Sequence, residues 1–238
     1  DDAFLQGAGR PLLVETARYW ASRIEPDRQG HGHIRRVIGP DEYHEAINDN
    51  AFTNVMARWN LRRAAELVLT APEGPAAAAS FAEAAEWRRI AESLVDGYQK
   101  SSGLYEQFDG FFGLQPLLIR DIANQRPVAA DLLLGSEGVG RTQVVKQADV
   151  LMLHLLVPDE VVPGSLRPNL DYYEPRTAHG SSLSPGVHAA LMARAGNVSD
   201  ASRMLAMTAR LDLDDLTSST AGGLHLAAMG SLWMALVT

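Results

Sequence analysis

A run of acids, amides and aromatic residues between Val37 and Asn54 contains the side chains that acid–base chemistry needs. The pair Gly39-Pro40 predicts a break in the chain, so the acidic run Asp41 to Glu45 is expected on a loop. Apolar residues at helical spacing follow and predict a helix over 49–70. Carboxylates on a loop held against a helix suit a catalytic role. The alternative is a solvated acidic turn in which Asn50 caps the helix.

A second candidate segment begins polar and ends apolar between Arg141 and Val157, which predicts one buried helix. Lys146, Gln147 and Asp149 would then lie at its polar start, close to the interior or to a cavity. A buried lysine needs a partner, which would be Asp149, another acid or a ligand. A structural salt bridge is the alternative to a role in ligand binding.

A third candidate is the turn His179-Gly180-Ser181-Ser182, which precedes a helix expected over 185–195. Backbone N–H groups and hydroxyls that converge at the positive end of a helix dipole predict an anion-binding turn. The alternative is that Ser182 or Ser184 only caps the helix.

The elements that must position these residues are helices. Apolar spacing predicts about eight of them, including 9–24, 49–70, 76–93, 185–195, 199–210 and 224–237. Residues 98–113 are expected to form a loop pinned by buried aromatic rings, and 131–140 and 158–168 to be glycine- or proline-rich connections. Without alternating strand patterns or a fixed repeat, the chain is expected to be all-α, a helical toroid rather than a short-looped bundle.

Composition excludes several classes of protein. The chain has 238 residues, 46% of them hydrophobic, and 29 acids against 21 basic residues give a net charge of -8. Without a basic stripe, neither nucleic acid nor a membrane surface is expected as a partner. The absence of cysteine excludes disulfides and fits the cytoplasm, where the protein is expected. The pair His31 and His33 lacks a third ligand, so no metal site is expected.

Four segments, taken together, resemble glycoside hydrolase family 65, the inverting disaccharide phosphorylases that act on α-linked glucosides. They occur in the family's order and cover most of the chain: LVETARYWASR at 13–23, GPDEYHE at 39–45 with DNAFTN and MARWNL after it, KQAD at 146–149, and HGSSLS at 179–184 with DLDD and GGLHLAAMG downstream. The resemblance implies an (α/α)6 barrel whose active site is built from loops at one end. It also implies that this chain is only part of a single barrel domain.

The resemblance to this family implies a role for each candidate residue. Glu42 matches the general acid, and Lys146 and Gln147 match residues that hold the glucosyl unit. The phosphate-binding residues would be His179, Gly180, Ser181, Ser182 and His225. Disaccharide and inorganic phosphate are the implied substrates, phosphate acting as co-substrate without a further cofactor, and a homodimer is left open. An N-terminal β-sandwich, the first barrel helices and a C-terminal β-domain would lie outside this chain.

The chemistry favours phosphorolysis on separate grounds. Inverting cleavage needs an acid at the leaving oxygen and a nucleophile on the opposite face of the sugar. Water would need a carboxylate base, whereas phosphate needs neutral or cationic donors, and neither HGSSLS nor GGLHLAAMG contains an acid. Asp212, Asp214 and Asp215 could supply a base, but they are interpreted as a polar helix boundary. Glu42 must hold its proton near neutrality, so partial burial or nearby acids are expected around it. A trehalase-like hydrolase and a non-catalytic helical fragment remain the alternatives.

Overall fold

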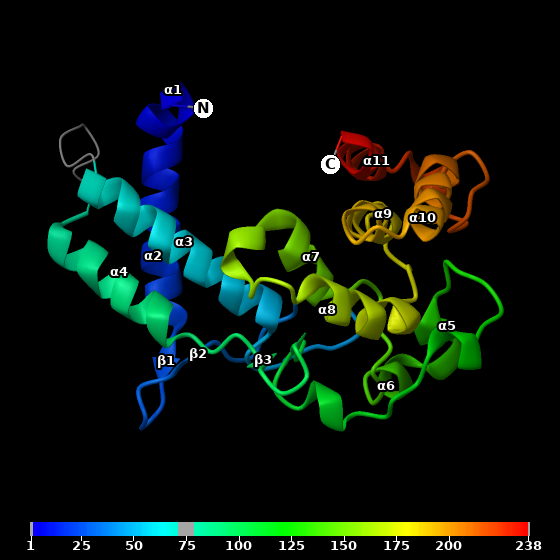
Figure 1. Cartoon of the computed structure of the whole chain (residues 1–238), viewed down its shortest axis with the longest axis horizontal. Helices are drawn as coiled ribbons and strands as arrows, with labels where there is room; N and C mark the ends of the chain where they lie inside the picture. Colours follow the sequence, from blue (N-terminus) through cyan, green and yellow to red (C-terminus); the bar gives the residue numbers. More distant parts are fainter. Residues whose placement is uncertain (1, 71–78, 238) are drawn as a thin grey trace.

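The structure is a computed structural model that describes residues 2–70 and 79–237. Within these residues, eight α-helices have eight or more residues, and the strands are two-residue segments in two antiparallel pairs. The all-α prediction is confirmed. Figure 1 shows a helical group at each end of the molecule, with α7 and α8 between them and long loops along one side.

The N-terminal group is built on small side chains. It comprises α1 (Asp2–Phe4), a π-helical turn (Leu5–Gly9), α2 (Arg10–Arg23), α3 (Ala51–Thr70) and α4 (Phe81–Ser93). Buried alanines such as Ala64 and Ala84 let α3 and α4 approach closely around Trp87. Ser80 and Glu83 form a capping box that starts α4. The beginning expected for this helix, from residue 76, lies outside the described residues.

The middle of the chain is mostly loop. It contains β3 (Tyr98–Gln99), β4 (Leu104–Tyr105), the 3-10 turns Phe111–Gly113 and Ile119–Asp121, α5 (Ala130–Leu134) and α6 (Ser136–Val139). The other strand pair, β1 (Glu25–Pro26) and β2 (Gly32–His33), lies earlier, between α2 and α3. Tyr105, Phe108 and Phe111 are buried, and the two phenylalanine rings pack edge to face at 5.2 Å. This confirms the prediction of a loop pinned by aromatic rings over 98–113.

The C-terminal part of the chain continues the helical packing. Between the two groups lie α7 (Asp149–Leu156), a 3-10 turn (Pro158–Glu160), α8 (Leu166–Tyr173) and a 3-10 turn (Glu174–Arg176). The C-terminal group comprises α9 (Ser184–Arg194), α10 (Val198–Arg210), a 3-10 turn (Thr220–Gly222) and α11 (Leu226–Val237). The apolar helix α7 contacts both α3 and α9, so its buried leucines, Leu151 and Leu153, link the two helical groups.

Three local predictions were wrong. The helix expected over 141–157 begins only at Asp149, because the backbone N–H of Lys146 donates to a carboxylate far away in the sequence. The connection expected over 158–168 already contains the first turn of α8, and the one over 131–140 contains α5 and α6.

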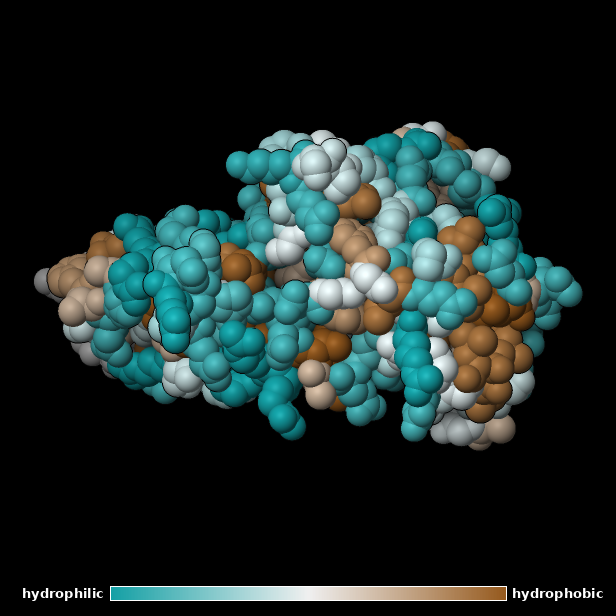
Figure 2. All heavy atoms as spheres, turned by 90° about the horizontal axis from the view of Figure 1, so that it is seen from below, coloured by the Kyte–Doolittle hydropathy of each residue, from teal (hydrophilic) through white to brown (hydrophobic). Residues whose placement is uncertain are grey.

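The surface carries apolar side chains as well as charged ones. Figure 2 shows brown, apolar areas interrupting a hydrophilic face toward the end that carries α5. Leu132 in α5 is 83% exposed, and Leu226, Trp233 and Leu236 of α11 are also exposed. Among the described helices, none combines the length and the apolar character that crossing a membrane requires.

Candidate active site

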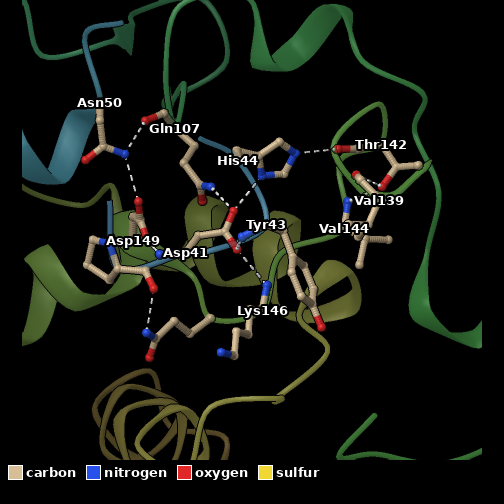
Figure 3. Close-up of polar contacts among 12 residues, drawn as sticks. Asp41, Tyr43, His44, Asn50, Gln107, Val139, Thr142, Val144, Lys146 and Asp149 are labelled. Atoms are coloured by element: carbon tan, nitrogen blue, oxygen red, sulfur yellow. Dashed lines mark hydrogen bonds and ion pairs between the residues drawn. The ribbon is translucent and has the colours of Figure 1, made fainter. Parts of the chain in front are cut away.

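Asp41 is the buried anchor of the acidic loop (Figure 3). Its Oδ1 accepts hydrogen bonds from the backbone N–H of Lys146 at 2.8 Å and of Tyr43 at 3.3 Å. Its Oδ2 accepts one from the Gln107 amide at 3.0 Å and lies 2.6 Å from Nδ1 of His44. One carboxylate therefore ties the loop to the segment that carries Lys146 and to the aromatic loop.

His44 lies between two acceptors. Its Nε2 is 3.0 Å from the carbonyl oxygen of Thr142, which can only accept, so Nε2 carries a hydrogen. Its Nδ1 faces the buried Asp41 carboxylate at 2.6 Å, so each of the two groups gives the other a polar partner. The ring packs against Phe108 and Phe111, which exclude water from the pair.

Asp149 is a second buried carboxylate, and it fixes the entrance to the loop. It accepts the backbone N–H of Asp41 at 2.6 Å and the side-chain amide of Asn50 at 2.7 Å. Burial and, after it, the negative charge of Asp41 raise the pKa of Asp149 well above its usual range, against the lowering effect of these hydrogen bonds. Asn50 also accepts the N–H of Thr53 at 2.9 Å, so it caps the following helix, as the alternative interpretation of this turn expected.

Gly39 leaves no room for a side chain. A Cβ atom there would overlap the carboxylate of Asp149 and would lie 2.7 Å from Nδ2 of Asn50. The loop can pass over the Asp149–Asn50 hydrogen bond only because this residue is glycine.

Glu42 points away from this buried network. Its side chain is 62% exposed and forms an ion pair with the ammonium of Lys146. It opens on a pocket of about 380 Å³, whose other lining residues are Tyr43, Glu45, Asp131, Ser136, Glu137 and Val139. The partner of Lys146 is thus an acid other than Asp149. The partial burial expected for Glu42 is not found, but Glu45 lies in the same pocket, as expected.

Gln147 offers an unused acceptor. Its Nε2 donates to the carbonyl oxygen of Pro40 at 2.6 Å. Its Oε1 is buried without a hydrogen-bond partner in the described part of the chain. A buried amide oxygen without a donor is costly, so a donor such as a sugar hydroxyl would be favourable there.

The turn at Gly180 contacts both other candidate segments. A Cβ atom on Gly180 would lie 3.3 Å from Lys146 Cγ, from the Tyr43 hydroxyl and from the carbonyl oxygen of Val128. The Tyr43 hydroxyl also accepts the N–H of Ala130 at 3.0 Å, and burial raises the pKa of this tyrosine to about 12. Three segments distant in sequence therefore converge beside Glu42.

His179 lies at the same turn, but its ring faces the interior. Its Nδ1 lies 2.9 Å from the Ser184 hydroxyl, and its Nε2 is buried without a partner among the described residues. Burial and the neighbouring His188, 4.6 Å away between ring centroids, lower the pKa of His179 well below its usual range. The ring is therefore neutral near pH 7. Ser181 and Ser182 are half-buried, and the Ser181 carbonyl accepts the N–H of Ser184 at 3.1 Å.

His225 lies in a separate C-terminal cluster just before α11. Asp212 accepts its backbone N–H at 2.8 Å and lies 2.6 Å from its Nδ1. Within residues 2–70 and 79–237, no hydrogen bond joins His225 to the acidic loop. Asp212 was interpreted from the sequence as a polar boundary, so its contact with His225 was missed. The anchoring roles of Asp41, His44 and Gln107 were also missed, although the first two stand inside the DEYHE motif itself.

A solved structure of another protein has the same fold. A protein from the human microbiome, provisionally named kojibiose phosphorylase, has a solved structure that superposes with a TM-score of 0.89 at 30% sequence identity, over 100% of this chain and 36% of that one. The fold is therefore part of a helical (α/α)6 barrel.

The family follows from the sequence match. The model of the glycosyl hydrolase family 65 central catalytic domain matches residues 1–234. The chain belongs to glycoside hydrolase family 65. It is 35% identical to kojibiose phosphorylase of Caldanaerobacter subterraneus subsp. tengcongensis over 253 aligned residues, and 38% identical to α,α-trehalose phosphorylase of Geobacillus stearothermophilus over 250. These matches cover 100% and 98% of this chain but 32% of each relative, so the chain spans about a third of their length.

Proposed function

We propose that the protein carrying this chain cleaves an α-linked glucose disaccharide with inorganic phosphate, with inversion, to give β-glucose 1-phosphate and a free sugar. The names of the relatives support phosphate as the nucleophile. The observation that carries the proposal is the placement of Gly180 beside Lys146, such that an added Cβ atom would lie 3.3 Å from Lys146 Cγ, while the ammonium of Lys146 pairs with Glu42. The expected proton donor and the expected anion turn thus meet at one point.

In the proposed reaction, a phosphate oxygen attacks the anomeric carbon while the bond from that carbon to the glycosidic oxygen breaks. The carboxyl of Glu42 gives its proton to the departing oxygen and is left as a carboxylate. In the free protein Glu42 is paired with Lys146. A glucosyl unit that takes hydrogen bonds from Lys146 would loosen this pair, and burying Glu42 under the sugar would favour its neutral, proton-donating form.

The proposed binding roles follow the contacts. Lys146 and the free Oε1 of Gln147 would hold glucosyl hydroxyls. Phosphate would be bound by Gly180, Ser181, Ser182 and His225. His179 would act through the backbone of the turn, because its neutral ring is buried against Ser184 and His188. No cofactor is required by this chemistry, since phosphate is already an anionic nucleophile.

The proposal includes further barrel helices and β-domains outside this chain. The exposed apolar residues of α11, such as Trp233, support it, because an apolar helix face is normally covered by a neighbouring element. The relatives, about three times as long as the matched region, also support it.

A substrate panel tests the reaction. The full-length protein is incubated with trehalose, kojibiose, maltose or nigerose, with and without phosphate, and glucose 1-phosphate and glucose are measured. One disaccharide is expected to yield β-glucose 1-phosphate only with phosphate. Equal glucose release without phosphate would establish a hydrolase instead.

Glu42→Gln tests the proton donor. Because general acid catalysis is worth about 10²–10⁴-fold, turnover should fall by that factor. The side chain is exposed, so the circular dichroism spectrum and melting temperature should not change. Glu86→Gln, which removes another exposed glutamate paired with an arginine, Arg89, is the control and should keep full activity. Wild-type turnover in Glu42→Gln would exclude this assignment.

A further inference from the structure

Asp212 contacts His225 at two points. One carboxylate oxygen accepts the backbone N–H of His225 at 2.8 Å, and the other lies 2.6 Å from ring Nδ1. The Asp212 side chain is only 9% exposed. The hydrogen bond from His225 is also the main cause that lowers the pKa of Asp212. Asp212 is therefore an anion whose lone pairs are directed at His225.

This contact decides which end of the ring can meet a ligand. A carboxylate only accepts hydrogen bonds, so Nδ1 of His225 carries the hydrogen and Nε2 faces the other way. The neighbour of Nε2 is the Ser219 hydroxyl at 3.3 Å, and that hydroxyl has a closer partner in Thr217 at 2.7 Å. Nε2 is thus weakly engaged, and it is the nitrogen free to exchange its partner.

The neighbouring acids have different partners. Asp214 forms a surface ion pair with Arg210, with distances of 2.6 and 2.9 Å. Asp215 accepts the N–H groups of Ser219 and Thr220, each at 2.9 Å. Of the three aspartates that follow α10, Asp212 is the one that contacts His225. Asp214, two residues further along the chain, therefore serves as a matched control for substitutions of Asp212.

We propose that Asp212 is a positioning residue for phosphate. It holds the His225 ring in one orientation and in the Nδ1–H form, and it balances the charge of the ring when Nε2 also carries a hydrogen and donates to a phosphate oxygen. The inference rests on the proposed function, in which His225 contacts phosphate. It also argues against Asp212 as a hydrolytic base, because its oxygens already accept hydrogen bonds from the two N–H groups of His225 and from the Thr220 hydroxyl.

Phosphate binding is measured directly, so that the result does not depend on turnover. Inorganic phosphate is titrated calorimetrically into the full-length wild type, Asp212→Asn, His225→Gln and the double variant. Asp212→Asn should weaken phosphate binding at least tenfold, and Asp214→Asn should leave it unchanged. Because Asp212 acts through His225, the double variant should bind no more weakly than His225→Gln alone. An undiminished affinity in Asp212→Asn, or additive losses in the double variant, would overturn the inference.

The ring itself gives a second readout. In the 15N spectrum of the histidine side chains, the signal of His225 is identified by its loss in His225→Gln. Wild type and Asp214→Asn should show a protonated Nδ1, and Asp212→Asn should lose this preference. The same spectrum in both aspartate variants would contradict the proposed role.

The outcomes separate the two proposals. A wild type that binds phosphate without forming glucose 1-phosphate refutes the proposed function alone. A wild type that binds no phosphate overturns the positioning role of Asp212 as well. In enzyme assays, Asp212→Asn should raise the KM for phosphate at least tenfold and leave the KM for disaccharide within about twofold, since its contacts are confined to the His225 cluster.

Discussion

The pairs Asp41–His44 and Asp212–His225 bring the same two side chains to the same distance, 2.6 Å, in different surroundings. The side chains of Asp41 and His44 are 1% and 2% exposed. Asp41 also accepts hydrogen bonds from Gln107 and Lys146, which are 66 and 105 positions away in the sequence. Asp212 and His225 are 9% and 24% exposed. The hydrogen-bond partners of Asp212 lie within 13 positions of it.

The difference shows two ways to place a polar residue at a site. The acidic loop is held by the folded chain as a whole, because its buried hydrogen bonds join segments from three parts of the sequence. The histidine near α11 is held by its own turn. Substitutions in the first pair should therefore propagate through the fold, whereas those in the second should act locally.

The largest effect is expected for Asp41→Ala. The change leaves the Gln107 amide and the N–H of Lys146 buried without an acceptor, so it should cost about 3 kcal/mol or more, at about 1–3 kcal/mol for each unsatisfied group. Thermal unfolding and hydrogen exchange of residues 37–50 and 141–149 would measure the loss. Asp212→Ala should raise exchange only around 211–226. Equal global destabilisation by the two variants would contradict the comparison.

An effect that is absent at pH 7 and grows in acid is expected from the buried ring of His188, which packs against His179 of the Gly180 turn. Burial lowers the pKa of His188 from 6.5 to about 3. Between about pH 6.5 and pH 3, His188 is therefore protonated in the unfolded chain but neutral in the folded one. Stability is fully present above pH 6.5 and falls toward pH 3, by up to about 1.4 kcal/mol per pH unit for this residue. His188→Leu should remove that share of the slope in urea unfolding at pH 7, 5 and 4, and an unchanged slope would refute the explanation.

The smallest effect on stability is expected for Gly180→Ala. The added methyl would press on Lys146, Tyr43 and Val128, and such overpacking typically costs about 1 kcal/mol. The displaced turn should lower kcat/KM for phosphate more than it lowers the melting temperature. Gly113→Ala, where no atom lies within 4 Å of the added carbon, is the control. Unchanged kinetics in Gly180→Ala would mean that the contact with Lys146 is not part of the site.

Local sequence patterns were sufficient for the regular helices. Apolar spacing predicted helices over 49–70 and 199–210, and the structure has α3 at Ala51–Thr70 and α10 at Val198–Arg210. Asn50 was recognised as a cap because capping depends on residues three positions apart. Proline obscured α8, since Pro168 lies in its first turn, where proline is tolerated.

The long-range contacts could not be predicted in the same way. Lys146 was expected inside a helix, because periodicity cannot show that its N–H is taken by Asp41, 105 positions earlier. The residue types of the candidate site were visible, but the pairing of Lys146 with Glu42 depends on how the segments fold together. Gln107, in an aromatic loop, gave no sequence signal for its contact with Asp41.

Gly39 has a consequence for random mutagenesis of the acidic loop. A Cβ atom there would overlap the Asp149 carboxylate and crowd Asn50, so every replacement would displace the loop. The side chain of Glu45, a few residues further on, is exposed. Ala46 is exposed as well, but its φ of 54° lies in the left-handed region, which restricts the residues that can replace it. A library directed at this loop should keep position 39 constant and place its diversity at 45.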